Sequence, residues 1–442
     1  MDRRALSSAC IALLALAAPA LADTIKVPKD FDTINEAVAA AQAGDTVSVS
    51  KGTYIEQVFV GVSGIKLVGK QAVIDAEYGA ACIDIQADDV SVSGFTLVNG
   101  ATGLFATGSN INVSKCHVYN ATVVGISVTG GAAMISGNTV TACGRNGILY
   151  DRSAIGDTLI EKNTCTRNGF DGISATGAGL TLSKNRCELN GERGIQVTVA
   201  DLSGDGAPAS APVTVEKNTC LQNDVGLLLL NGTASAVTLS KNDCSNNADR
   251  GLIVDAIEPV VSGNSCEDNG GIGLHLLTGG ALVEKNACSG NRGSGIALDS
   301  NADIPNGGGF GDGSDNVLGS NTCKDNGGDG IQVFAGANNV LDANKCLGNG
   351  DDGIDLDDVS ITDATVSGNT CNDNGHEGID NSGQATVITD NVCKKNGYGI
   401  GPDIGGTGDE GGGTVAAFTG NKLGTGGDTT TSRLDNYGET EP

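Results

Sequence analysis

The chain has 442 residues, a formal net charge of −27, 68 glycines and 14 cysteines, with 3% aromatic residues and no tryptophan. So acidic a chain is unsuited to nucleic acid or to an anionic membrane surface as its main partner, because like charges repel. Few aromatic rings also leave few stacking platforms for sugars, which argues against a strong carbohydrate binder.

Residues 1–22 have the features of a secretory signal peptide. Arg3 and Arg4 precede an apolar run over residues 11–18, and Ala20-Leu21-Ala22 offers a small-residue cleavage site. The run is too short to span a membrane, and no later segment reaches about 20 apolar residues. We therefore expect a secreted or periplasmic protein without a membrane span.

Residues 23–46 are predicted to form an N-terminal strand and a capping helix, with the helix over residues 30–44. Thr33 and Glu36 have the spacing of a capping box, and an alanine-rich run follows until Gly44. An open solenoid exposes strand edges and core at its ends. We interpret this segment as an α-helical cap over the first coil.

One short pattern recurs eleven times between residues 112 and 396. It is Asn-x-Cys-x-x-Asn, a variable bridge, Gly-Ile or Gly-Leu, and a few alternating apolar residues, as in the copy from Lys162 to Ile173. The usual step of 22 to 25 residues is typical of a solenoid with one supersecondary unit per repeat. The cysteine column contains Cys116, Cys165, Cys187, Cys220, Cys244, Cys266, Cys288, Cys323, Cys346, Cys371 and Cys393.

Each repeat is predicted to be built of strands, because the residues after the glycine alternate with period 2, as in Gly330-Ile331-Gln332-Val333. Stacked coils lie about 4.8 Å apart, so equivalent residues should form ladders. We expect the cysteines inside as free thiols. The first asparagine of each repeat should bond up and down the stack at a corner: Asn163, Asn185, Asn218, Asn242, Asn264, Asn286, Asn321, Asn344, Asn369 and Asn391.

These repeats resemble the right-handed parallel β-helix (pectin-lyase-like) superfamily, which includes pectate lyases, polygalacturonases and periplasmic β-helix accessory proteins. Right-handed winding is also the default for parallel strands joined by crossovers. The resemblance implies an all-β chain, a single right-handed parallel β-helix solenoid over residues 47–424 with an N-terminal α-helical cap. Residues 425–442, rich in Gly, Thr and Asp, are predicted to be a flexible tail.

Three insertions, at residues 200–212, 299–316 and 402–413, leave the same corner of the coil. Loops on one edge of a solenoid commonly build its binding face. Their Gly and Asp content suits Ca²⁺, which takes six to eight oxygen ligands, but is equally that of a polar, flexible loop. The candidate metal ligands are Asp303, Asp312 and Asp315.

Acidic residues concentrate in three successive coils near the C-terminal end. They occupy the positions around the Gly-Ile step, and like charges so close raise one another's pKa or call for a cation. We call this set the acid strip: Asp329, Gln332, Asp351, Asp352, Asp355, Asp357, His376, Glu377 and Asp380.

The strip resembles the active-site stack of the polygalacturonase family of inverting glycoside hydrolases, through Asp329-Gly330, Asp351-Asp352 and Gly375-His376. The resemblance implies that Asp352 is the general acid, that Asp329 and Asp351 activate water, and that His376 supports them. Inverting hydrolysis needs carboxyl groups about 6.5 to 9.5 Å apart. Gln332, Asp355, Asp357, Glu377 and Asp380 would then bind substrate.

Two classes of function remain open. The first is a scaffold that binds a glycan or a protein, with Ca²⁺ as a stabilising ion. The second is a polysaccharide-active enzyme, either a glycoside hydrolase or a uronate polysaccharide lyase or epimerase. A lyase would use a basic residue, and Arg193 and Arg250 lie in the pre-glycine column near Asp171, where surface ion pairs are the alternative. The absence of the family's Arg-Ile-Lys coil favours the scaffold, and the acid strip favours the enzyme.

Overall fold

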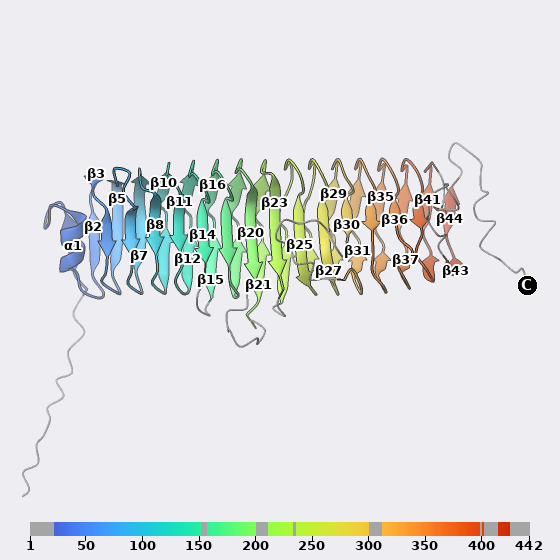
Figure 1. Cartoon of the computed structure of the whole chain (residues 1–442), viewed down its shortest axis with the longest axis horizontal. Helices are drawn as coiled ribbons and strands as arrows, with labels where there is room; N and C mark the ends of the chain where they lie inside the picture. The colour runs from blue at the N-terminus through green and yellow to red at the C-terminus, as the bar shows by residue number, and fades with distance from the viewer. Residues whose placement is uncertain are drawn as a thin grey trace, which may run out of the picture.

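A computed structural model describes residues 22–151, 157–199, 211–232, 236–299, 312–397, 400–401 and 414–424. These residues form a single β-solenoid of about 15 turns in which every paired strand is parallel to its neighbours (Figure 1). The predicted all-β solenoid is thus confirmed. The predicted signal peptide, apart from Ala22, and the predicted tail over 425–442 lie outside the described residues.

One sheet holds one strand from nearly every turn and faces outward along the whole solenoid. Its fifteen strands, in order, are β4 (Val58–Val60), β6 (Ala81–Ile85), β8 (Thr102–Ala106), β11 (Val124–Val128), β14 (Ile148–Asp151), β17 (Ile173–Thr176), β20 (Arg193–Val199), β23 (Val225–Asn231), β25 (Leu252–Ile257), β27 (Leu274–Gly279), β30 (Ile296–Leu298), β33 (Ile331–Val333), β36 (Ile354–Leu356), β39 (Ile379–Asn381) and β42 (Ile400–Gly401). We call it the fifteen-stranded sheet.

The other two faces of the turn are built from the remaining strands. A six-stranded sheet contains β29 (Ala287–Ser289), β32 (Thr322–Lys324), β35 (Lys345–Leu347), β38 (Thr370–Asn372), β41 (Val392–Lys394) and β44 (Lys422–Gly424). A 23-stranded sheet contains β1 (Thr24–Val27), β2 (Thr46–Val49), β3 (Gly52–Ile55), β5 (Lys66–Asp75), β7 (Ser91–Val98), β9 (Ile111–Ser114), β10 (His117–Tyr119), β12 (Ala133–Ser136), β13 (Thr139–Thr141), β15 (Thr158–Glu161), β16 (Thr164–Thr166), β18 (Leu180–Ser183), β19 (Arg186–Glu188), β21 (Val213–Glu216), β22 (Thr219–Leu221), β24 (Val237–Ser240), β26 (Val260–Ser262), β28 (Leu282–Glu284), β31 (Val317–Gly319), β34 (Val340–Asp342), β37 (Thr365–Ser367), β40 (Thr386–Thr389) and β43 (Val415–Thr419). Isolated bridges from Thr219 in β22 through Asp243 and Ser265 to Ala287 in β29 connect the 23-stranded sheet to the six-stranded sheet.

The cysteine column lies inside the solenoid, as predicted. Cys165, Cys187 and Cys220 are register partners on successive strands, and the thirteen cysteines of the described chain are all buried free thiols. They pack with Val, Ile and Leu into one continuous core. The thiol therefore acts here as a small apolar group that fits between parallel strands one coil apart.

Two asparagine ladders run along the corners of the coils. Asn264 shows the pattern: its Oδ1 accepts from the backbone N–H of Asn242 at 2.9 Å, and its Nδ2 donates to Asn286 Oδ1 at 3.0 Å and to the Leu239 carbonyl at 3.1 Å. The predicted first ladder is confirmed. The second ladder contains Asn168, Asn190, Asn223, Asn247, Asn269, Asn291, Asn326, Asn349, Asn374 and Asn396.

The one helix among the described residues is shorter than predicted. Helix α1 (Ile34–Ala40) has seven residues, although Thr33 and Glu36 do form the expected capping box. It ends early because Ala41 is already extended and the Asp45 carboxylate accepts the backbone N–H of Gln42 at 2.8 Å, which starts the turn into β2. One short helix with three buried residues does not support the predicted α-helical cap over residues 30–44.

No helix in the part of the chain that the structure describes is both long enough and apolar enough to cross a membrane.

Candidate functional site

The acid strip lies on the fifteen-stranded sheet, where β33, β36 and β39 are neighbours. Gln332, Asp355 and Asp380 are register partners on these strands, so they form one column one residue wide. The flanking Ile354 and Leu356 are completely buried in the core, which turns Asp355 outward. These three polar side chains therefore share one outward column.

Glycine allows the strip coils to approach closely. A Cβ added to Gly330 would overlap the carbonyl oxygen of Gly353 and the Cβ of Cys346. The residue before each such glycine therefore lies against the next coil, two residues before its strand begins at Ile331 or Ile354. In the strip that residue is Asp329, Asp352 or Glu377.

The carboxylates of Asp329 and Asp352 are each tied to the next coil. Asp329 Oδ1 accepts the backbone N–H of Asp352 at 2.9 Å, and Asp352 Oδ1 accepts that of Glu377 at 2.5 Å. Both side chains are more than 90% buried. Ser294, one coil earlier in the same column, places its Oγ 3.3 Å from Asp329 Oδ2 and 2.9 Å from Gln332 Oε1. Backbone donors and one hydroxyl thus fix the inner part of the strip.

Burial changes the acidity of these groups. It raises the pKa of Asp329 to about 6, and with the added repulsion of Glu377 it raises the pKa of Asp352 to about 9. Burial and the charges of its neighbours raise the pKa of Asp355 to about 10, and the pKa of Asp357 also rises. No Lys or Arg of the described chain lies within ion-pair distance of Asp329, Asp352 or Asp355. The ionised strip consequently lacks a counter-charge from those side chains.

Two sets of three side chains could each hold a metal ion. One oxygen from each of Asp329, Asp352 and Asp355 lies within 4.8 Å of the others, and Asp351, Asp352 and His376 form a second such set. In the second set His376 Nδ1 lies 2.6 Å from Asp351 Oδ1, and both side chains are about half exposed or more. The first set is all oxygen, the donor type that Ca²⁺ prefers, whereas the second adds an imidazole nitrogen.

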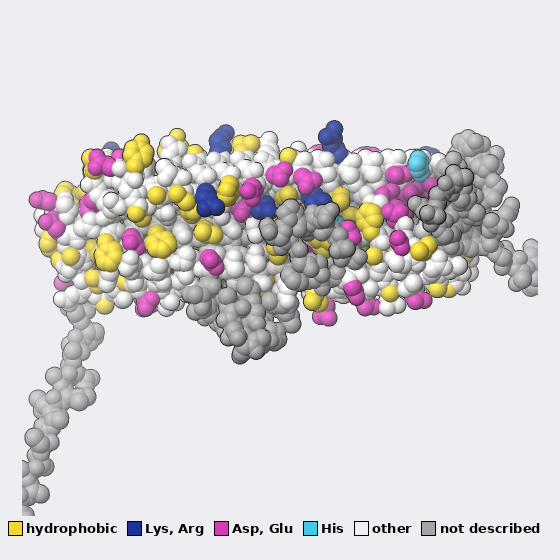
Figure 2. Space-filling model, viewed as in Figure 1, with side chains coloured by type: hydrophobic (Ala, Val, Ile, Leu, Met, Phe, Trp, Pro, Cys, Tyr) yellow, Lys and Arg dark blue, Asp and Glu magenta, His cyan; other side chains and the backbone are white. Residues whose placement is uncertain are grey.

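The outer strip residues have other partners. Gln332 Nε2 donates to Asp357 Oδ2 at 3.4 Å, and Asp380 Oδ1 accepts the backbone N–H of Asn381 at 2.7 Å. Figure 2 shows Asp and Glu side chains gathered beside a His toward the C-terminal end of the solenoid. The nine predicted residues thus lie on three adjacent coils of one face.

The predicted loop ligands do not join the strip. Asp303 lies outside the described residues. Asp312 is exposed and accepts the backbone N–H of Ser314, while Asp315 is exposed and accepts from Asn338. Neither belongs to a set of three close ligand atoms among the described residues.

Ser294 hydrogen-bonds to the acid strip, and sequence reasoning did not identify it. It precedes Gly295 exactly as Asp329 precedes Gly330, so an alignment of the pre-glycine column would have placed it one coil before the first strip carboxylate. A small neutral side chain gave no chemical signal by itself.

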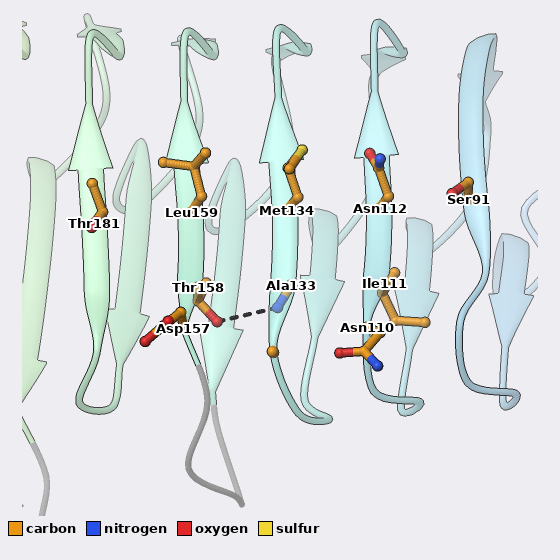
Figure 3. A pocket seen from close by; sticks show the side chains of 11 residues that line it. Ser91, Asn110, Ile111, Asn112, Ala133, Met134, Asp157, Thr158, Leu159 and Thr181 are labelled. Atoms are coloured by element: carbon orange, nitrogen blue, oxygen red, sulfur yellow. Dashed lines mark hydrogen bonds between the residues drawn. The ribbon is translucent and has the colours of Figure 1, made fainter. Parts of the chain in front are cut away.

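A shallow groove lies elsewhere, on the outer face of β9, β12, β15 and β18 (Figure 3). Met134 and Leu159 are register partners at its centre, and Thr158 Oγ1 accepts the backbone N–H of Ala133 at 3.2 Å. Its lining contains one acidic side chain, Asp157, and otherwise apolar, hydroxyl and amide groups. It carries no cluster of titratable groups comparable to the strip.

Two family models match the chain. The model described as a right handed beta helix region matches residues 124–306, 205–336 and 281–409. The model described as periplasmic copper-binding protein (NosD) matches residues 38–205, which bears out the secreted or periplasmic location expected from the N-terminal segment. No curated protein matches the chain.

Several solved structures share the solenoid architecture at low identity. Pectate lyase Pel9A is 13% identical with a TM-score of 0.39, over 57% of this chain and 75% of its own. The periplasmic alginate epimerase AlgG is 14% identical with a TM-score of 0.39, over 86% and 84%. The mannuronan C-5 epimerase AlgE6 A-module of Azotobacter vinelandii is 13% identical with a TM-score of 0.34, over 88% and 93%. With TM-scores below 0.5, these similarities carry no argument about this chain.

Copper does not fit the residues that match the copper-binding family. Within the described part of residues 38–205, no three His, Cys, Asp or Glu side chains bring ligand atoms together. The five cysteines there are buried in the core, and the one histidine, His117, is exposed on β10. The Asp351, Asp352 and His376 set lies outside the matched segment.

Proposed function

This chain belongs to the right-handed β-helix family, and from that premise we propose that it is a secreted or periplasmic scaffold whose acid strip binds an acidic polysaccharide through Ca²⁺. The observation that carries the proposal is the set formed by Asp329, Asp352 and Asp355, whose oxygens lie within 4.8 Å of one another. Three half-buried to buried carboxylates at this spacing repel one another unless a cation or protons neutralise them.

Calcium suits this set better than the other metals considered. Ca²⁺ takes six to eight oxygens at 2.3 to 2.6 Å, from carboxylates, carbonyls and water, in flexible geometry. Three carboxylates supply only part of that shell, so ligand oxygens from outside the protein complete it. Copper and zinc favour nitrogen and sulfur donors, of which this set has none.

The cation also explains how so acidic a protein would hold an acidic polymer. With a net charge of −27, the bare strip repels a polyuronate. A bound Ca²⁺ offsets most of the negative charge of Asp329, Asp352 and Asp355, and its remaining coordination positions accept carboxylate oxygens of the polymer. Gln332, with Asp357 and Asp380 at the rim of the strip, offers hydrogen bonds to the hydroxyl groups of the bound sugar.

The test is calcium-dependent binding of polygalacturonate and alginate. Titration calorimetry in Ca²⁺ and in EDTA would compare the wild type with Asp355→Asn, and thermal unfolding would follow the stabilisation by Ca²⁺. We expect Ca²⁺ at 100 times its Kd to stabilise the wild type by about 2.7 kcal/mol. EDTA and Asp355→Asn should each weaken polyuronate binding at least tenfold.

A matched control is Asp325→Asn, because Asp325 is an exposed carboxylate on another face, paired with Lys324 at 3.0 Å. It should retain both Ca²⁺ and polyuronate binding. Polyuronate affinity that is unchanged in EDTA and in Asp355→Asn would refute the proposal.

One observation favours a second function, hydrolysis of the bound polysaccharide. Burial sets the pKa of Asp352 to about 9 and that of Asp329 to about 6, so near neutral pH one carboxyl can donate a proton while the other accepts one. We place it second because oxygens within 4.8 Å leave less room than the 6.5 to 9.5 Å separation that an inverting hydrolase uses for water.

Product analysis separates these functions. Reducing ends without absorbance at 235 nm would indicate hydrolysis, and both signals together would indicate a lyase. Asp352→Asn should abolish either signal. If the wild type binds polygalacturonate or alginate but forms no product from either, binding without hydrolysis is the function.

A further inference from the structure

A second polar group lies on the fifteen-stranded sheet, five strand steps from the acid strip toward the N-terminus. Arg193 precedes Gly194 as Asp352 precedes Gly353, and Gln196 has the outward position that Asp355 has in its coil. Five steps of about 4.8 Å place the two groups about 24 Å apart on one face. Figure 2 shows Lys and Arg side chains near the middle of the solenoid with Asp and Glu side chains among them, and a further acidic group beside the His toward the C-terminal end.

The guanidinium of Arg193 is held on one side only. Its Nη1 lies 3.5 Å from Asp171 Oδ1, 3.0 Å from Glu192 Oε2 and 3.2 Å from Gln196 Oε1. Its Nε and Nη2 form no hydrogen bond with any residue in the described ranges, and the side chain is 21% exposed. Nε and Nη2 therefore keep an adjacent pair of N–H donors that no described residue occupies.

The residues that support Arg193 have hydrogen-bond partners of their own. Asp171 is 4% exposed and also accepts the backbone N–H of Arg193 at 3.2 Å. Gln196 Nε2 donates to Thr198 Oγ1 at 3.4 Å, and Ser174 is the register partner of Gln196. The orientation of Arg193 is thus fixed before any ligand arrives, which lowers the entropic cost of binding.

This arrangement is poorly explained by stability alone. Burial raises the pKa of Asp171 to about 6 even though Arg193 lies beside it, so the ion pair does not repay the desolvation of the carboxylate. Arg250, in the same column two steps on, contacts one carboxylate at 3.7 Å and lacks this support. A carboxylate whose pKa stays raised despite a cationic partner is typical of binding sites.

We propose that Arg193, positioned by Asp171 and Gln196, forms an anion subsite that binds the carboxylate of an acidic sugar residue without a metal ion. Two adjacent guanidinium N–H donors match the two oxygens of a carboxylate. Gln196, Thr198 and Ser174 beside it offer donors and acceptors for sugar hydroxyls. The proposal rests on the acidic polysaccharide proposed above and adds a second point of attachment for it.

The experiment measures binding of trigalacturonate in EDTA, which removes Ca²⁺ and so prevents calcium-dependent binding at the acid strip. The wild type should bind it weakly, and Arg193→Gln should lower the affinity at least tenfold. Arg186→Gln is the matched control, because Arg186 is 57% exposed on another face and pairs with Glu188 at 2.6 Å. It should bind as the wild type does.

Two further measurements keep the outcomes distinct. Gln196→Ala removes one support without touching the charge and should lower the affinity about threefold, even if Arg193→Gln folds poorly. Asp355→Asn should lose only the calcium-dependent binding, so failure of the strip and failure of this subsite give different results. Equal affinity of the wild type and a folded Arg193→Gln in EDTA would overturn the proposal, as would no binding by the wild type.

Discussion

The asparagine ladder makes a quantitative prediction at Asn264, in the middle of the solenoid. Asn264→Ala removes four hydrogen bonds: two accepted from the backbone and side chain of Asn242, and two donated to Leu239 and Asn286. Asn264 is 1% exposed, so water cannot replace them without entering the core. The Asn242 backbone N–H loses its acceptor altogether.

The cost follows from these contacts. A buried polar group left unsatisfied costs about 1 to 3 kcal/mol, and each further hydrogen bond contributes about 1 kcal/mol net. Relaxation of the neighbouring groups recovers part of this cost, so we expect Asn264→Ala to lower the free energy of unfolding by roughly 2 to 5 kcal/mol. The loss should begin locally, because each coil of a solenoid contacts only its neighbours.

Urea unfolding followed by circular dichroism gives the size of the loss, and amide hydrogen exchange shows whether the coils around Asn264 open first. The control is Asn372→Ala, since Asn372 Oδ1 accepts the Lys394 backbone N–H in an exposed setting. Its effect should stay within about 0.5 kcal/mol. A loss below about 1 kcal/mol in Asn264→Ala would show that the ladder contributes little to stability.

Two further predictions concern acidity and thiols. Burial raises the pKa of Asp171 in the folded state from 3.8 to about 6, so between these pH values the folded state holds a proton that the unfolded state has released, and the free energy of unfolding falls as pH rises. Relative to Asp171→Asn, the wild type should lose up to about 3 kcal/mol of this free energy across the window. Melting temperatures of the two proteins that change in parallel with pH would contradict this prediction. The thirteen described cysteines are buried, and desolvation raises the pKa of thiols such as Cys187 and Cys220. A thiol reagent should therefore label none of the thirteen in the native protein and all of them in guanidinium. Labelling of the native protein would contradict this prediction.

Much of the fold could be predicted because the repeat itself fixes the register. Once coils are one period long, Cys165 must lie beside Cys187, and Asn264 beside Asn286, whatever the details of each turn. The end of α1 could not be predicted in the same way. It depends on one contact outside the repeats, in which the Asp45 carboxylate accepts the Gln42 backbone N–H, and the repeat pattern does not predict that contact.

The strip could be predicted as a column but not as a site. The period places Gln332, Asp355 and Asp380 in one line, and the structure agrees. Which oxygens converge, and that Ser294 joins them, depends on side-chain rotamers and on burial by neighbouring coils, which sequence spacing does not contain. The Arg193 group was visible in sequence only as an ion pair, because its open donors appear only once the contacts of Nη1 are known.

The ladders also bear on how such a chain can lengthen or shorten over evolutionary time. Every ladder asparagine bonds to another of the same kind, so a duplication or deletion of one whole coil rejoins equivalent partners at the new junction. Copy number in the middle of the solenoid can therefore drift at little cost to folding. The coils that carry the first ligand set differ from the others: Asp329 lies on one coil and Asp352 and Asp355 lie on the next, so losing either coil breaks the set. The number of coils is thus free to vary, while the identity of these two is not.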